Sequence, residues 1–371
     1  MKMIIILKYL VIFFMLGFKK FVSGYIYKKK GYIRNSLIAF TALFSITTNV
    51  AFAESKKYVA VEPLTCDIIK SIALPTDEVT CLTDRKQDVH DLKISPKQAR
   101  LLKNADKVFT LGTEMTPAMR NWVKKNNTIV IGVSVIDIEV HNDHDDHNSA
   151  KKNEDHDDHG NSAKKHEGHD DHHHDHGGVD PHVWHDPHNI IKMGEIVSKS
   201  LKKDVSDEEL RNAISKRFKT FDKTLEDLDK WIIKQVSTIP PSNRIIVSKH
   251  KAMEYYGDAF GFETISLLDF LGHSSSLRPK NLAKVLEELN EENVKVLFKE
   301  QVPASKLLNN LSKQSSIPLS SNQIFVDGLM MDGNTVTVAV HNTCTIVNEL
   351  GGSCDEATGF NLASKWGSLN Q

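Results

Sequence analysis

Short apolar runs rich in β-branched residues alternate with longer amphipathic stretches along the chain beyond residue 54. In the first half these runs lie at residues 58–61, 78–82, 107–111 and 128–131, and helical patterns near Leu64, Pro96 and Pro117 separate them. After Pro240 and Pro241 the same rhythm returns at residues 244–247, 263–267, 294–298 and 323–326, with helical patterns near Met253, Leu282 and Ser305. Alternation of strand and helix indicates a parallel sheet covered by helices. The pattern therefore predicts an α/β protein with two parallel-sheet lobes.

A long amphipathic segment, residues 206–238, lies between the two lobes. Its apolar residues recur every three or four positions, the period of one helical face: Leu210, Ile214, Phe218, Phe221, Leu225, Leu228 and Ile232. Ser206 and Glu209 predict a capping box at its start. At 1.5 Å per residue the helix is about 45 to 50 Å long, enough to pack along both lobes as a rigid strut. A coiled-coil dimer is the alternative for such a helix, and we expect a monomer.

Charge is distributed unevenly along the chain. Residues 1–53 contain eight of the 47 Lys and Arg residues and none of the 48 Asp and Glu residues. The remainder is therefore acidic overall, which disfavours nucleic acid as a partner because phosphate binding needs clustered basic side chains. Together with the elements above, this divides the chain into a leader at 1–53, an N-terminal lobe at 54–205, the linking helix at 206–238 and a C-terminal lobe at 239–371.

The leader has the features of a secretory signal. A basic cluster from Lys28 to Arg34 precedes an apolar run and then Ala51-Phe52-Ala53, an A-x-A cleavage pattern. A retained membrane anchor is the alternative, but the run is shorter than the roughly 20 apolar residues of a spanning helix. No cysteine follows the cleavage pattern. We therefore expect export to the periplasm without a lipid anchor.

Four cysteines follow the leader, at Cys66, Cys81, Cys344 and Cys354. Three pairings are possible. In an oxidising compartment the simplest joins near neighbours, Cys66 with Cys81 and Cys344 with Cys354, because each bridge then stays within one lobe. Metal ligation is the alternative, although no pair has the close C-x-x-C spacing of a zinc knuckle.

Residues 141–177 form a low-complexity insert within the N-terminal lobe. They hold eleven of the 18 histidines and eleven acidic residues, with no aliphatic residue larger than alanine. Such a segment cannot bury a core, so it is predicted to be a disordered loop. Neutral imidazoles at this density bind zinc, copper or nickel weakly. A solvated tract without a metal role is the alternative.

A specific metal site needs ligands on ordered structure, and α/β sheets bind ligands at their strand ends. His90 follows the second run of the first lobe, and His182 lies in a DPHVW motif after the insert. His250 and Asp327 end two runs of the second lobe. Three imidazoles and one carboxylate suit tetrahedral zinc, whereas manganese favours more carboxylate and a higher coordination number.

Around these residues the chain resembles the periplasmic zinc-binding proteins of ABC importers, the ZnuA-like solute receptors, over residues 55–350. The resemblance rests on the His90 block, the DPHVW motif directly after a His/Asp-rich loop, the segment from Ser248, and the strand ending in Asp327. It implies two α/β lobes bridged by one long rigid helix, with the metal site in the cleft between them.

The resemblance also implies ligand roles for His90, His182 and His250, with Asp327 as the fourth ligand. The family's usual Asp-Pro-Leu is Asp327-Gly328-Leu329 here, and Val89 stands where some zinc members carry Glu. Nearby polar residues receive lesser roles in this interpretation. Asp180 is expected to orient His182, Glu300 to take part in polar packing, His185 and His188 to lie outside the ligand set, and His341 to be structural. For His273, transient metal capture near the cleft is only an alternative.

The predicted function is a high-affinity receptor that captures Zn²⁺ in the periplasm and delivers it to an ABC permease and its ATPase. Within the same family the alternative is a manganese or iron receptor. A zinc hydrolase would need an open coordination position and a general base, and no H-E-x-x-H motif occurs. We therefore expect no enzyme activity. A His-rich zinc buffer, with the lobes only displaying the loop, is the remaining alternative.

Overall fold

The structure is a computed structural model that describes residues 55–85, 87–133, 180–271, 279–301 and 306–370. The leader, the His-rich insert and His273 lie outside these residues, so the predictions made for them stay predictions. Within the described part of the chain, no helix has both the length and the apolar character needed to cross a membrane.

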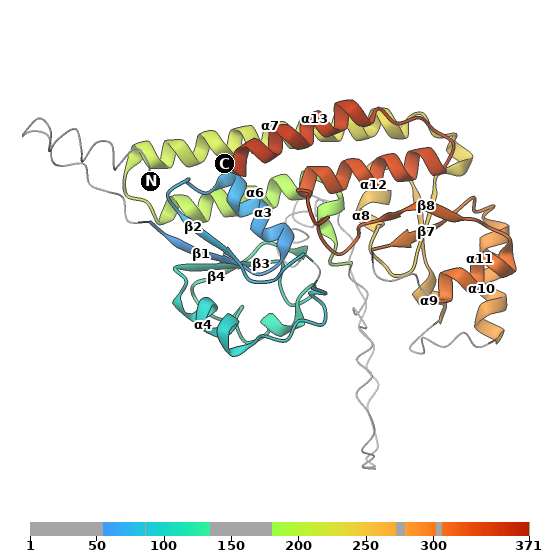
Figure 1. The fold of residues 1–371 in the computed structure, drawn as a ribbon, viewed down its shortest axis with the longest axis horizontal. Helices are drawn as coiled ribbons and strands as arrows, with labels where there is room; N and C mark the ends of the chain where they lie inside the picture. Colours follow the sequence, from blue (N-terminus) through green and yellow to red (C-terminus); the bar gives the residue numbers. More distant parts are fainter. Residues whose placement is uncertain (1–54, 86, 134–179, 272–278, 302–305, 371) are drawn as a thin grey trace, which may run out of the picture. The chain divides into compact units, whose positions relative to one another are not determined.

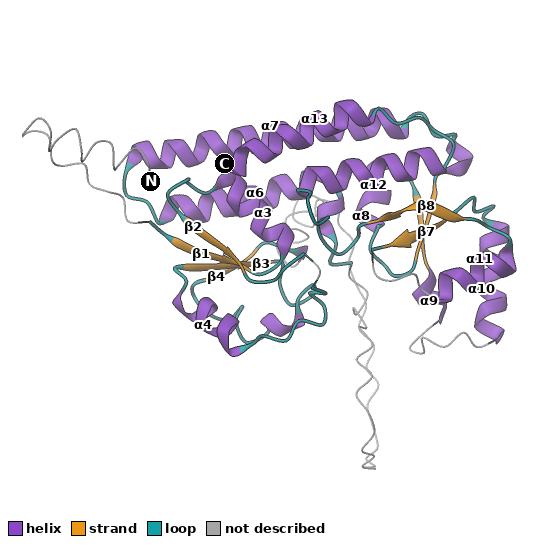
Figure 2. Cartoon of the chain, viewed as in Figure 1, coloured by secondary structure: helices purple, strands orange, loops and turns teal. Residues whose placement is uncertain are grey.

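The N-terminal lobe contains a four-stranded parallel sheet in the order β2-β1-β3-β4 (Figures 1 and 2). Its strands are β1 (Lys57–Ala60), β2 (Glu78–Cys81), β3 (Lys107–Thr110) and β4 (Thr128–Val130). Helices α3 (Pro63–Ile72) and α4 (Pro96–Asn104) follow the first two strands, and Ser95 and Gln98 form a capping box at the start of α4. The pattern near Pro117 forms only a 3-10 turn, Pro117–Met119, instead of a longer helix.

The C-terminal lobe repeats this arrangement with a parallel sheet in the order β6-β5-β7-β8. Its strands are β5 (Ile245–Ser248), β6 (Glu263–Ser266), β7 (Leu297–Glu300) and β8 (Leu319–Ile324), and its outer helices are α8 (Glu254–Phe260), α9 (Leu267–Leu271), α10 (Pro279–Glu291) and α11 (Lys306–Ser315). The last two strands begin three residues later and four residues earlier than predicted. Val294 and Val326 are buried although they lie outside β7 and β8. Because buried residues beside a strand are as apolar as the strand itself, the apolar pattern does not mark where the strand begins or ends.

A layer of long helices joins the two lobes: α6 (Pro187–Lys203), α7 (Glu208–Val236), α12 (Thr335–Glu349) and α13 (Glu356–Gly367). Helix α7 has 29 residues, about 44 Å at 1.5 Å per residue. It contacts α3, α6, α8, α12 and α13 (Figure 1). The predicted bridging helix is therefore present.

The start of α7 differs from the prediction. The N-cap is Asp207, whose carboxylate accepts hydrogen bonds from the backbone N–H groups of Glu209 and Leu210 at 2.7 and 3.2 Å. The expected capping box of Ser206 with Glu209 was wrong. Serine and aspartate are both good N-caps, so two adjacent candidates leave the helix start uncertain by one residue.

Buried polar contacts and close packing hold the helical layer to the N-terminal lobe. The Asp67 carboxylate on α3 accepts hydrogen bonds from Thr335 at the start of α12, from Trp366 on α13, and from Asn370. On α6, a Cβ at Gly194 would lie 2.3 Å from the Phe221 ring of α7. Only glycine permits that approach between the helices.

Two disulfides brace the lobes, and both are the near-neighbour pairs. Cys66–Cys81 joins α3 to β2, and Cys344–Cys354 joins α12 to the chain before α13. No cysteine is free. The predicted pairing is therefore confirmed, and the alternative of cysteine metal ligands is wrong.

Candidate metal centre

The four residues predicted to bind metal come together between the two sheets. His90 lies in the loop after β2, and His182 immediately precedes the 3-10 helix Val183–His185. His250 follows β5 by two residues, and Asp327 follows β8 by three. One ligand atom from each lies within 4.8 Å of the others, the only such group of His, Cys, Asp or Glu side chains in the described ranges. The four residues predicted from the strand ends therefore lie together in the structure.

A single oxygen of Asp327 lies at the centre of the three imidazoles. Its Oδ1 is 2.9 Å from Nε2 of His182, 3.2 Å from Nε2 of His250 and 3.4 Å from Nε2 of His90. A tetrahedron around zinc with bonds of about 2.0 to 2.1 Å has edges of about 3.3 Å. The three oxygen-to-nitrogen distances are therefore already close to those that a tetrahedral ion requires.

Burial differs among the four side chains. The His182 imidazole is fully buried, whereas the side chains of His250 and Asp327 keep 19% and 18% of their surface exposed. The exposed pair belongs to the C-terminal lobe. Solvent therefore reaches the cluster through these two side chains more than through His182.

Without metal, the contacts between imidazole and carboxylate favour protonated histidines. Burial by itself lowers the pKa of His182, but hydrogen bonds to Asp180 and Asp327 outweigh it and raise this pKa. Burial also lowers the pKa of His250. The negative charge of Asp327 is the largest of the effects that raise this pKa, and the result lies well above the usual histidine value. Burial disfavours the Asp327 carboxylate, yet His250 and the other imidazoles hold its pKa well below normal. The raised pKa values of His182 and His250 thus favour protonation of imidazoles that would have to be neutral to bind a metal ion.

Two further carboxylates contact two of the imidazoles at Nδ1, the ring nitrogen that does not face Asp327. Asp180 Oδ1 is 2.7 Å from Nδ1 of His182, and Glu300 Oε2 is 2.9 Å from Nδ1 of His250. An Nδ1–H that donates to a carboxylate leaves Nε2 as the metal-binding nitrogen and makes it more basic. Both histidines therefore present Nε2 to the centre in a fixed orientation.

Asp180 contacts His182 as the sequence predicted, whereas Glu300 does more than the polar packing expected of it. Its second oxygen also accepts a hydrogen bond from the backbone N–H of Lys249 at 2.6 Å. Its position in the sequence could have indicated this role. Glu300 is the last residue of β7, and β7 pairs with β5, the strand that leads to His250.

The other described histidines lie outside the ligand set, as expected. His185 is buried, and its Nε2 donates to the Val326 carbonyl at 3.1 Å. Burial, followed by the charge of His182, lowers the pKa of His185 to about 4, so this ring is neutral. His188 is exposed beside Asp186, and His341 in α12 donates to the Gln323 carbonyl at 2.9 Å.

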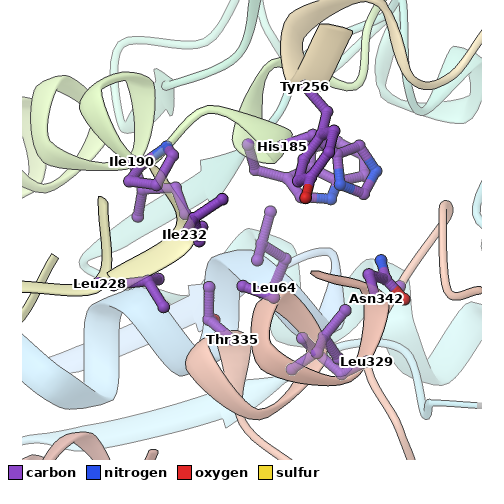
Figure 3. A pocket seen from close by; sticks show the side chains of 14 residues that line it. Leu64, His185, Ile190, Leu228, Ile232, Tyr256, Leu329, Thr335 and Asn342 are labelled. Atoms are coloured by element: carbon purple, nitrogen blue, oxygen red, sulfur yellow. The ribbon is translucent and has the colours of Figure 1, made fainter. Parts of the chain in front are cut away.

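A small cavity of about 20 Å³ is lined by residues that follow His182 and Asp327 (Figure 3). Its walls include Trp184 and His185, which follow His182, and Gly328 and Leu329, which follow Asp327. The remaining lining is mostly apolar and comes largely from α3, α6, α7 and α12. It has room for about one water.

Comparison with known proteins agrees with this architecture. The model of the ZnuA family, "Zinc-uptake complex component A periplasmic", matches residues 59–349. The manganese ABC transporter substrate-binding lipoprotein PsaA of Streptococcus mitis is 24% identical over 299 residues, 80% of this chain and 89% of that one. The manganese-binding lipoprotein MntA of Halalkalibacterium halodurans is 26% identical over 178 residues, 47% of this chain and 58% of that one.

Solved structures show the same fold. The periplasmic zinc-binding protein TroA of Treponema pallidum superposes with a TM-score of 0.63 at 18% identity, covering 80% of this chain and 99% of that one. Fe(III)-bound YtgA of Chlamydia trachomatis superposes with a TM-score of 0.61 at 17% identity, with the same coverage. Two parallel-sheet lobes, a bridging helix and a family match over most of the chain lead to one conclusion: the chain belongs to the ZnuA family of metal-binding receptors that serve ABC importers and are not enzymes.

Proposed function

We propose that this receptor carries zinc, which it holds with His90, His182, His250 and Asp327. The observation that carries the proposal is the set of three Nε2 atoms around Asp327 Oδ1 at 2.9 to 3.4 Å. Three nitrogens and one oxygen form a donor set that suits tetrahedral zinc. The carboxylates of Asp180 and Glu300 already bond to imidazoles, which disfavours their use as additional metal ligands.

Manganese or iron is the second candidate cargo, and relatives favour it. The names of PsaA and MntA specify manganese, and that of MtsA of Streptococcus pyogenes, 23% identical over 312 residues, specifies iron. Manganese prefers oxygen ligands and a higher coordination number than zinc. Among the described side chains, the nitrogen-rich centre therefore supports zinc more than manganese.

Export and delivery complete the proposal. Residues 1–53 direct the chain to the periplasm, where the receptor, built from lobes 54–205 and 239–371 and helix 206–238, passes zinc to an ABC permease driven by its ATPase. The relatives PsaA and MntA are named lipoproteins, whereas no cysteine precedes Cys66 here. We propose a monomer without a lipid anchor, in which loop 141–177 adds weaker zinc sites.

The central test is a zinc and manganese titration of the receptor lacking residues 1–53, by calorimetry with a competing chelator. A second version also lacks residues 141–177, and His182→Ala and His188→Ala are made in both. We expect one tight zinc site that survives loop deletion and His188→Ala but is lost in His182→Ala, with weaker manganese binding. Tighter manganese binding would establish the second candidate cargo instead. Loss of tight zinc binding with the loop would make the protein a buffer.

A further inference from the structure

The backbone around Asp327 is irregular and has contacts with both lobes. On its own side, Asn342 of α12 bonds to the N–H and to the carbonyl of Phe325, both at 2.8 Å. Residues 326–333, here called the Asp327 segment, run from the end of β8 to the N-cap of α12 without regular secondary structure. Gly328 occupies the position at which the ZnuA-like receptors usually have proline. A Cβ atom added at Gly328 would have no other atom within 4 Å. Glycine leaves this turn freer than proline would, so the position of the Asp327 carboxylate depends more on contacts with neighbouring residues.

Further contacts with this segment come from the N-terminal lobe. The Arg85 guanidinium donates from Nη1 to the carbonyls of Met330, at 2.5 Å, and Gly333. His185 donates from Nε2 to the carbonyl of Val326 at 3.1 Å. Three backbone carbonyls on the two sides of Asp327 are therefore held by side chains of the opposite lobe.

The positions of the two donors relate them to the ligands. Arg85 precedes His90 by five residues in the loop after β2, and His185 follows His182 by three residues. The two loops that carry the N-terminal ligands thus also hold the segment that carries the fourth ligand. Any movement of the lobes apart must break these hydrogen bonds together with the bond from metal to Asp327.

We propose that Arg85 and His185 are positioning residues that clamp the Asp327 segment to the N-terminal lobe and thereby set how long the bound metal is retained. The inference rests on the proposed metal site and extends it from the ligands to the contacts that keep the site closed. Charge-assisted hydrogen bonds such as those of Arg85 are stronger than neutral ones, and changes in such contacts act mainly on dissociation.

The first test measures zinc release from the loaded receptor into excess EDTA by stopped-flow. Arg85→Ala is expected to release zinc about ten- to a hundredfold faster, the range that follows from losing hydrogen bonds to a charged donor, with little change in the association rate. Arg85→Lys keeps the charge and a donor and should restore part of the retention. Arg100→Ala removes an exposed arginine from α4 and should behave as wild type. Equal release rates for Arg85→Ala and Arg100→Ala would overturn the proposal.

A double-mutant comparison separates positioning from general structural support. In an Asp327→Ala background the clamp has no ligand to position, so adding Arg85→Ala should leave the release rate unchanged. If Arg85→Ala accelerates release as strongly there as in wild type, Arg85 does not act through Asp327 and the proposal fails. His185→Gln, which keeps a side-chain N–H donor, should release zinc more slowly than His185→Ala.

A readout without metal distinguishes failure of the clamp from failure of the zinc assignment. Amide hydrogen exchange of residues 326–333 in the metal-free receptor should be faster in Arg85→Ala than in wild type or Arg100→Ala. Unchanged exchange would overturn the clamp even if zinc binds tightly. Faster exchange in a protein that prefers manganese would support the clamp while rejecting zinc as cargo.

Discussion

Glu300 Oε2 lies 2.9 Å from Nδ1 of His250, joining the end of β7 to the loop after β5. The carboxylate is nearly fully buried and also accepts hydrogen bonds from two backbone N–H groups. It therefore holds the His250 ring in one orientation before any ion arrives. A cargo site gains from this because less ordering remains to be done when the ion binds.

Replacement of this carboxylate should weaken zinc binding without abolishing it. In Glu300→Gln the side chain keeps its size and one acceptor, but Nε2 of His250 becomes less basic. We expect a loss of about 10- to 100-fold in zinc affinity, as is typical for partners of ligating histidines. Competition with a chelator measures it. Glu263→Gln, at the exposed start of β6, is the matched control, and an equal effect in both variants would contradict the role of Glu300.

Zinc binding should release protons, and more of them as the pH falls toward 6. The pKa values of His182 and His250 are raised in the metal-free centre. Both imidazoles therefore stay protonated to a higher pH than an ordinary histidine, whose pKa is about 6.5. Zinc must displace these protons. As the pH is lowered, the affinity for zinc should therefore begin to fall at a pH above 6.5. Calorimetry in buffers of different ionisation enthalpy counts the protons, and release of none at pH 6.5 would contradict the described protonation.

The metal-free receptor should lose stability as the pH rises. A histidine whose folded pKa is raised stabilises the fold fully below its unfolded pKa of about 6.5, and this contribution disappears as the pH rises through the folded pKa. Asp327, with a lowered pKa, acts oppositely and loses its contribution only in acid. Thermal unfolding between pH 6 and 9 should thus show Tm falling by a few degrees. His182→Ala should flatten this slope, and an unchanged slope would contradict the assignment.

Metal preference should depend on the third histidine and its carboxylate partner together. His250→Glu would supply two nitrogens and two carboxylates, a donor set better suited to manganese. The new carboxylate would lie against Glu300, however, and like charges disfavour one another. We therefore expect His250→Glu alone to bind both metals weakly, and His250→Glu with Glu300→Gln to shift the zinc-to-manganese affinity ratio toward manganese. Titration of the single and double variants with both ions decides this. A double variant with the wild-type ratio would show that His250 does not set the preference.

Much of the architecture was accessible from the sequence because it depends on local pattern. Six of the eight strands lie within a residue or so of their predicted positions, and the apolar face of α7 is continuous along its buried side. Burial imposes a period of two or 3.6 residues on neighbouring positions, and that period is legible in a single chain. The nearby cysteine pairs, 15 and 10 residues apart, were predictable for the same reason of proximity.

The clustering of His90, His182, His250 and Asp327 was predictable because parallel strands present their carboxyl ends at one edge of a sheet. Among the partners that hold these ligands, Asp180 was predictable because it lies two residues before His182, whereas the roles of Glu300 and Arg85 were not. Glu300 lies 50 residues from His250, and Arg85 lies 245 residues from Met330. No local period records such contacts, since they arise only when separate loops pack together. Residue order thus determined the elements and the candidate ligands. Packing within the C-terminal lobe brought Glu300 to His250. Packing of the two lobes decided which side chains hold the segment around Asp327, because hydrogen bonds depend on distance in space.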